Sequence, residues 1–81
     1  MTRAISHRLV GYETRTERVV FERAIPGTRM PLVKDIARVD ADDPEAAGSY
    51  PLSADQAHHI ADVIGAPSPP VNVDFFLEPT D

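Results

Sequence analysis

Cysteine and tryptophan are absent from this 81-residue chain, and only five of its residues are aromatic. Small secreted domains usually need disulfides for stability, so the lack of cysteine favours a reducing compartment, and we expect a cytoplasmic protein. The same absence removes thiolate chemistry and the sulfur ligands of structural zinc sites. A chain of this length can form one domain, residues 1–81, but not two domains with separate cores.

Long apolar runs are missing as well. Residues 1–5 lack the run of roughly 7–15 apolar residues that marks a signal peptide, and no segment reaches the roughly 20 residues that a membrane span requires. Hydrophobic residues still make up 42% of the chain and charged residues 26%, which indicates a globular protein rather than a disordered one. Arginine outnumbers lysine seven to one, a bias that favours a GC-rich bacterial genome.

Basic residues are absent from the second half of the chain. Residues 1–39 contain all eight Lys and Arg and four acids, for a net charge of +4, whereas residues 40–81 contain nine acids, for −9. Such asymmetry is typical of a nucleic-acid-binding half or of an acidic interaction surface. The simpler interpretation, which we favour, is that the two halves fold onto each other and their fields partly cancel.

The apolar pattern predicts a hairpin at the start of the chain. Residues 5–12 and 18–25 are rich in β-branched and aromatic side chains, and the polar residues 13–17 between them suit a loop. In the second strand Val19, Phe21 and Ile25 share one face, and Arg23 interrupts it.

Two helices are predicted next. Pro31 suits a first helical position, and apolar residues at helical spacing predict a helix over residues 31–39. Residues 43–48 resemble a single turn with Asp43 as N-cap. Ser53 and Gln56 form a capping box at the start of a helix that runs to Ile64 and stops at Gly65.

A last strand is predicted over residues 71–78 and ends at Pro79. Its inward face contains Val71, Val73, Phe75 and Leu77. The order β-β-α-α-β predicts an α+β fold in which two helices cover one face of a three-stranded antiparallel sheet.

For each candidate catalytic or metal-binding residue in the sequence, a structural role is the better explanation. His58 and His59 point about 100° apart on a helix, and pairing either with Asp55 or Asp62 gives too few ligands for zinc. The acidic run at residues 40–45 fails the spacing of an EF-hand loop, and capping and solubility explain it. His7, Tyr12 and Tyr50 could act as acids or bases, as could the histidine pair, but no nucleophile motif accompanies them. We therefore expect no enzyme, no metal and no cofactor.

The outer face of the sheet is the strongest functional candidate. If the odd-numbered residues of the last strand point inward, Phe76 points outward, on the side of Val20 and of Val10 or Tyr12. An apolar patch of this kind indicates a partner surface unless another part of the chain covers it. The residues that we expect to bind a partner are Tyr12, Val20, Glu22, Phe76 and Glu78.

The sequence therefore predicts a non-enzymatic protein-interaction module that self-associates or binds a partner protein through this face. One concrete form is a regulatory or small acidic immunity or antitoxin-like protein, whose acidic half would meet a basic toxin surface. The alternative is a nucleic-acid-binding regulator that uses the Arg-rich N-terminal hairpin.

Three stretches resemble a small uncharacterised bacterial protein family. They are Leu9-Val10-Gly11-Tyr12, Gly48-Ser49-Tyr50-Pro51-Leu52 and Asp74-Phe75-Phe76-Leu77-Glu78-Pro79, and the resemblance spans about residues 8–79. It implies a single bacterial domain with an early hairpin and a closing strand. It implies no activity and no functional residue.

Overall fold

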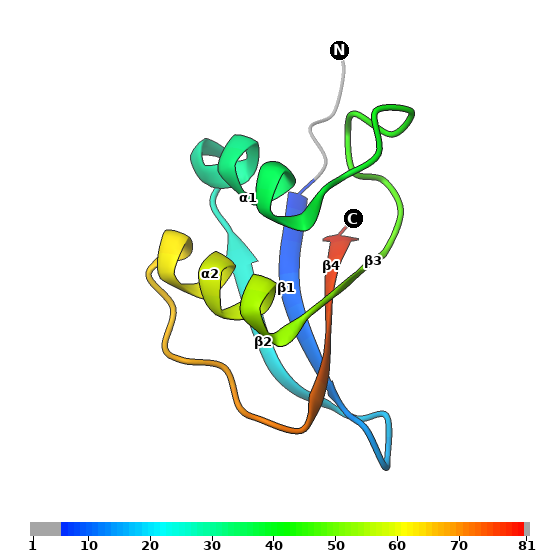
Figure 1. The fold of residues 1–81 in the computed structure, drawn as a ribbon, viewed down its shortest axis with the longest axis vertical. Helices are drawn as coiled ribbons and strands as arrows, with labels where there is room; N and C mark the ends of the chain where they lie inside the picture. Colours follow the sequence, from blue (N-terminus) through cyan, green and yellow to red (C-terminus); the bar gives the residue numbers. More distant parts are fainter. Residues whose placement is uncertain (1–5, 81) are drawn as a thin grey trace.

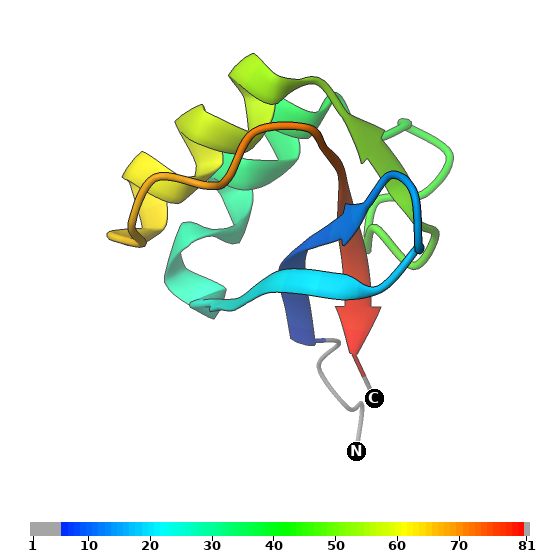
Figure 2. The ribbon, with the colours of Figure 1, turned by 90° about the horizontal axis from the view of Figure 1, so that it is seen from below.

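The computed structural model describes residues 6–80, which form one antiparallel sheet and two helices (Figure 1). In chain order the elements are β1 (Ser6–Glu13), β2 (Val19–Ile25), a 3-10 turn η1 (Gly27–Arg29), α1 (Met30–Ala37), β3 (Tyr50–Leu52), α2 (Ala54–Ile64) and β4 (Val73–Thr80). The strand order is β2-β1-β4-β3, and both helices lie on one face (Figure 2). The predicted α+β class is confirmed, but the sheet has four strands and not three.

The strand that the sequence did not reveal is β3, which contains only Tyr50, Pro51 and Leu52. It pairs with β4, with Tyr50 opposite Leu77 and Leu52 opposite Phe75. Proline cannot donate a hydrogen bond to a neighbouring strand, so it is tolerated because β3 lies at the edge of the sheet. Three residues with a central proline give no alternating pattern, which is why the strand was missed.

The bounds of the last strand differ from the prediction at both ends. Val71 was expected to point inward, but its side chain is 76% exposed. The strand begins only at Val73, because Asn72 has a left-handed backbone with φ 59°. At the other end Pro79 continues the strand opposite His7 rather than ending it. Pro79 has no N–H to donate to a neighbouring strand. It is tolerated because β3 pairs with β4 only as far as Leu77, so beyond Leu77 no strand on the β3 side needs that donor.

The first strand extends one residue past the predicted 5–12, to Glu13, and Ile5 lies outside the described residues. The second begins at Val19 rather than Arg18. A register shift between Gly11 and Tyr12 accompanies the turn, since Gly11 lies opposite Phe21 and Tyr12 opposite Val19. Val20 is therefore the extra residue of a β-bulge, and a bulge changes the alternation of side chains along the strand.

The second helix was predicted closely. The Ser53 hydroxyl accepts from the Gln56 N–H at 3.1 Å, and the Gln56 side chain accepts from the Ser53 N–H at 2.8 Å, which confirms the capping box. Gly65 ends the helix with φ 73°. The first helix is shorter than the predicted 31–39, because Arg38 takes a left-handed φ of 56° and stops it after Ala37.

The core lies between the sheet and the two helices, and its buried side chains come mainly from β1, β2, β4, α1 and α2. The sheet contributes Leu9, Phe21, Ile25, Phe75 and Leu77; the helices contribute Met30, Val33, Ala37, Ala57, Ile60 and Ala61. Each large apolar side chain buried here contributes about 1.5–3 kcal/mol relative to its exposed state. Neither described helix is long and apolar enough to cross a membrane.

Candidate functional site

The sheet face that points away from the helices is built by alternate residues of β1 and β4. Val10 lies opposite both Phe76 on β4 and Glu22 on β2, and Tyr12 lies opposite Asp74. Residues directly opposite each other in an antiparallel sheet point to the same side. The register therefore gathers these side chains on the outer face.

Two aromatic rings form the centre of this face. Tyr12 and Phe76 meet edge to face, with 5.7 Å between ring centroids and an angle of 73° between planes. The backbone partner of Glu78 is Arg8, four residues before Tyr12. The Tyr12 side chain therefore extends along β1, and its hydroxyl donates to both carboxylate oxygens of Glu78 at 3.0 Å. Val10 is fully buried here and is not part of the main core. The outer face thus has its own apolar centre, and side chains of the sheet cover it.

A network of charged side chains surrounds the rings. The Arg8 guanidinium forms ion pairs with Glu22 and with Glu78, the latter at 3.4 Å. The Ser49 hydroxyl also reaches Glu78, at 3.5 Å. Burial, and then the hydrogen bond to the Glu78 carboxylate, raise the pKa of Tyr12, so its hydroxyl stays a neutral donor at physiological pH. These hydrogen bonds and ion pairs hold the side chains of Arg8, Tyr12 and Glu78 in place.

Four of the five residues predicted to bind a partner meet on this face: Tyr12, Glu22, Phe76 and Glu78. Val20 does not join them. It lines a separate hollow of about 480 Å³ together with Val71 and Val73, near the end of the hairpin. Strand parity predicted Val20 on the outer face, but parity cannot be counted across a bulge.

Two members of the network were missed in the sequence. Arg8 is two residues before Val10 and four before Tyr12, so parity along β1 could have placed it on the same face. Ser49 gave no comparable indication, because it precedes a strand that the sequence did not reveal.

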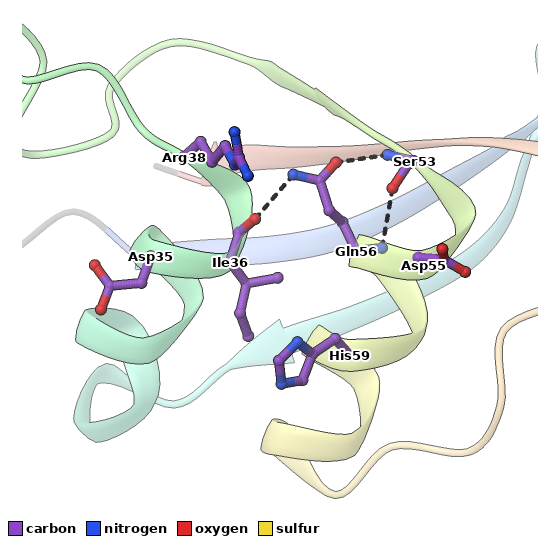
Figure 3. A pocket seen from close by; sticks show the side chains of 7 residues that line it. All are labelled: Asp35, Ile36, Arg38, Ser53, Asp55, Gln56 and His59. Atoms are coloured by element: carbon purple, nitrogen blue, oxygen red, sulfur yellow. Dashed lines mark hydrogen bonds between the residues drawn. The ribbon is translucent and has the colours of Figure 1, made fainter.

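A second hollow, of about 720 Å³, lies between the two helices (Figure 3). It is lined by Asp35, Ile36, Arg38, Ser53, Asp55, Gln56 and His59. Figure 3 shows the Gln56 amide bridging the helices, and its NH₂ group donates to the Ile36 carbonyl at 2.8 Å. Within residues 6–80 no hydrogen bond joins His59 to either carboxylate of the hollow, and His58 is exposed on the same helix. The hydrogen bonds seen here cap the start of α2 and join it to the end of α1.

The remaining acid–base candidates lie at one end of the sheet and hold the loop between α1 and β3. The buried His7 ring places Nε2 at 3.1 Å from the carbonyl oxygens of Glu45 and Ala46. The Asp43 carboxylate accepts from the Tyr50 hydroxyl at 2.6 Å and from two backbone N–H groups of its own loop, at 2.9 and 3.0 Å. These bonds lower the pKa of Asp43 and raise that of Tyr50.

The Asp43 carboxylate thus binds the N–H groups of Ala47 and Gly48 and holds its own loop. The predicted N-cap is wrong, because an N-cap would accept from Glu45 or Ala46 and no helical turn forms here. Within residues 6–80 no three His, Asp or Glu side chains lie close enough to hold a metal ion together. The loop is an anchored structural element, and the outer sheet face stays the best-defined candidate surface.

The chain belongs to the family described as Domain of unknown function (DUF7683), whose model matches residues 6–78. No curated protein and no solved structure matches it. The family match confirms the predicted resemblance to a small uncharacterised family over nearly the whole chain. The family description names no activity.

Proposed function

We propose that this member of the DUF7683 family is a non-enzymatic protein-binding module that docks a basic partner protein through the outer face of its sheet. An immunity or antitoxin-like protein of bacterial origin, which covers a basic toxin surface, is the concrete form that we favour. A regulatory subunit would use the same surface in the same way.

The observation that carries the proposal is the Tyr12–Phe76 ring pair inside a hydrogen-bonded charged network. Aromatic residues and arginine are the residue types most enriched at protein interfaces and at their energetic centres. Side chains already held in place lose less conformational entropy when a partner binds, which favours affinity. Tyr12 and Arg8 are held in this way by Glu78.

The charge of the face favours a different protein over a second copy of the chain. Beside the rings lie Glu17, Asp74 and Glu78, and the nearby Arg8 is already paired with two carboxylates. A two-fold symmetric dimer would place this acidic surface against itself, since both copies present the same patch. Like charges across an interface are costly, whereas a basic partner would be attracted and would associate faster.

The test is binding of the protein encoded by the neighbouring gene, measured by calorimetry with purified proteins. We expect a 1:1 complex whose affinity falls at least tenfold for Phe76→Asp and for Asp74→Lys. Asp62→Lys makes the same charge change on an exposed position of α2, and we expect it to bind like the wild type. Circular dichroism shows whether each variant is folded, and Asp74 is exposed, so its substitution tests the face without touching the core.

The proposal is wrong if the partner binds with unchanged affinity to both face variants. Molar mass from light scattering adds a second check. We expect the free wild type to be monomeric. A wild-type dimer that Phe76→Asp converts to a folded monomer would instead assign the face to self-association.

Nucleic-acid binding through the hairpin is the alternative, and it has less support. Figure 1 shows the hairpin loop at one end of the molecule, and this loop alternates two arginines, Arg15 and Arg18, with Glu13 and Glu17. Of the other hairpin arginines, Arg8 is ion-paired and Arg23 lies over the Phe21 ring at 5.1 Å. Retention on heparin that decreases steeply with salt would favour this alternative over a protein partner.

A further inference from the structure

The outer face contains a hollow of about 400 Å³ beside the two rings, and its lining suggests what part of a partner it receives. Tyr12, Glu17, Asp74, Phe76 and Glu78 line it. They come from β1, from the hairpin loop and from three alternate positions of β4. Its volume is at the lower end of the range for ligand sites, about 300–1,000 Å³, which suits a single side chain better than a drug-sized molecule.

The lining combines three carboxylates with two aromatic rings and includes no basic residue. Glu78 already accepts hydrogen bonds from Tyr12 and Arg8. Glu17 and Asp74 have exposed side chains with no hydrogen-bond or ion-pair partner within residues 6–80. The hollow therefore has two carboxylates ready to accept new bonds next to two aromatic rings.

A metal ion does not suit this arrangement, because within residues 6–80 no three His, Asp or Glu side chains lie close enough together to hold one. An organic cation does suit it, and the guanidinium group of arginine suits it best because it is planar and lies at the end of a long side chain. It can stack on an aromatic ring and donate paired hydrogen bonds to a carboxylate at the same time. An ammonium group is a compact point charge and can make fewer of these contacts together.

We propose that this hollow receives an arginine side chain of the partner protein, in contact with the Phe76 and Tyr12 rings and paired with Asp74 and Glu17. The inference rests on the proposed function, because it names the group of the basic partner that the outer face recognises. Glu17 is held over the hollow by the tight hairpin turn, in which it has φ 58° and its N–H donates to the Glu13 carbonyl at 2.7 Å.

The experiment is a titration of the isotope-labelled full chain with the blocked tripeptide acetyl-Gly-Arg-Gly-amide, followed by amide chemical shifts at constant ionic strength. The matched probe has citrulline in place of arginine, which keeps the shape and removes the charge. We expect saturable shifts centred on Asp74 and Phe76 with the arginine peptide and at least tenfold weaker binding of the citrulline peptide.

Two exposed carboxylates provide the variants. Asp74→Asn and Glu17→Gln should each weaken the arginine peptide about two- to fivefold, as expected for exposed ion pairs. Phe76→Leu, which keeps an apolar residue but removes the ring, should weaken it by a similar factor. Asp62→Asn removes a carboxylate elsewhere and should leave the affinity unchanged.

The inference is overturned if the citrulline peptide binds as well, or if shifts spread equally over the other acidic surfaces, such as residues 40–45. It is also overturned if the peptide produces no saturable shift. Failure of the inference and of the proposed function can be told apart. If Phe76→Asp abolishes partner binding but the wild type binds no peptide, the proposed function stands and the arginine site is refuted. Peptide binding in the hollow, together with a partner unaffected by Phe76→Asp, supports the site and refutes the function.

Discussion

Gly11 is the position where one added methyl group should do the most damage. It lies on β1 opposite both Phe21 and Phe75, whose rings meet edge to face at 6.3 Å on the helix side of the sheet. A Cβ atom at Gly11 would lie 2.7 Å from Val73 Cγ1, 3.0 Å from Phe75 Cε1 and 3.2 Å from Phe21 Cβ. The glycine thus leaves the space that these three side chains fill.

The expected cost of Gly11→Ala follows from two opposing effects. Overpacking a close-packed interior costs about 1–3 kcal/mol. Replacing glycine by alanine in a strand stabilises the folded state by about 0.5–1 kcal/mol, because the unfolded chain then loses less backbone entropy on folding. The net effect is a loss of about 0–2.5 kcal/mol of unfolding free energy, with a central value of about 1 kcal/mol. At about 4–8 °C per kcal/mol for a domain of this size, that central value lowers the midpoint of thermal unfolding by about 4–8 °C.

The assay is urea and thermal unfolding followed by circular dichroism, with Gly27→Ala as the matched control. A Cβ at Gly27 meets no atom within 4 Å, so the same substitution should be neutral or stabilise by up to about 1 kcal/mol. Adding Val73→Ala to Gly11→Ala should recover part of the loss, since it removes the closest contact. If Gly11→Ala is as harmless as Gly27→Ala, the close packing described here is not what Gly11 provides.

Three further predictions follow from single side chains. Arg38 and Gly65 both end helices with a backbone in the left-handed region. Arg38→Gly should therefore stabilise the protein by up to about 1 kcal/mol, and Gly65→Ala should destabilise it by about as much. Unfolding free energies in urea that change in the same direction for both variants would contradict this. Ser53→Ala should cost about 0.5–2 kcal/mol in the same assay, because it breaks the capping box, and a neutral result would show that the cap is dispensable. Hydrogen bonds from Tyr50 and the loop backbone lower the pKa of Asp43, so its stabilising effect is present above its ordinary pKa of about 4 and is lost as pH falls through the lower folded value. Acid unfolding curves should therefore be shallower for Asp43→Asn than for the wild type, and parallel curves would refute the assignment.

The candidate site illustrates how a small sheet can use both of its faces. One face buries the core under two helices, and the other buries Val10 under side chains of the sheet itself. Because Arg8 and Tyr12 both donate hydrogen bonds to Glu78, that second face keeps a defined shape without a covering element. This is the property that a docking surface needs when the partner is absent.

The sequence by itself determined the elements whose information is local. The Ser53–Gln56 capping box and Gly65 specify α2 because each bond joins residues within a single turn, and alternation specifies Phe75 as inward and Phe76 as outward. Tertiary structure decided what depends on distant partners. Strand β3 exists because β4 offers it a pairing edge, Val20 leaves the expected face because of a bulge, and Glu78 meets Tyr12 and Ser49 only through strand pairing. Such contacts join residues as many as 74 positions apart, since Ser6 pairs with Thr80. No local pattern encodes them, because the free energy that fixes them is gained only when the whole sheet forms.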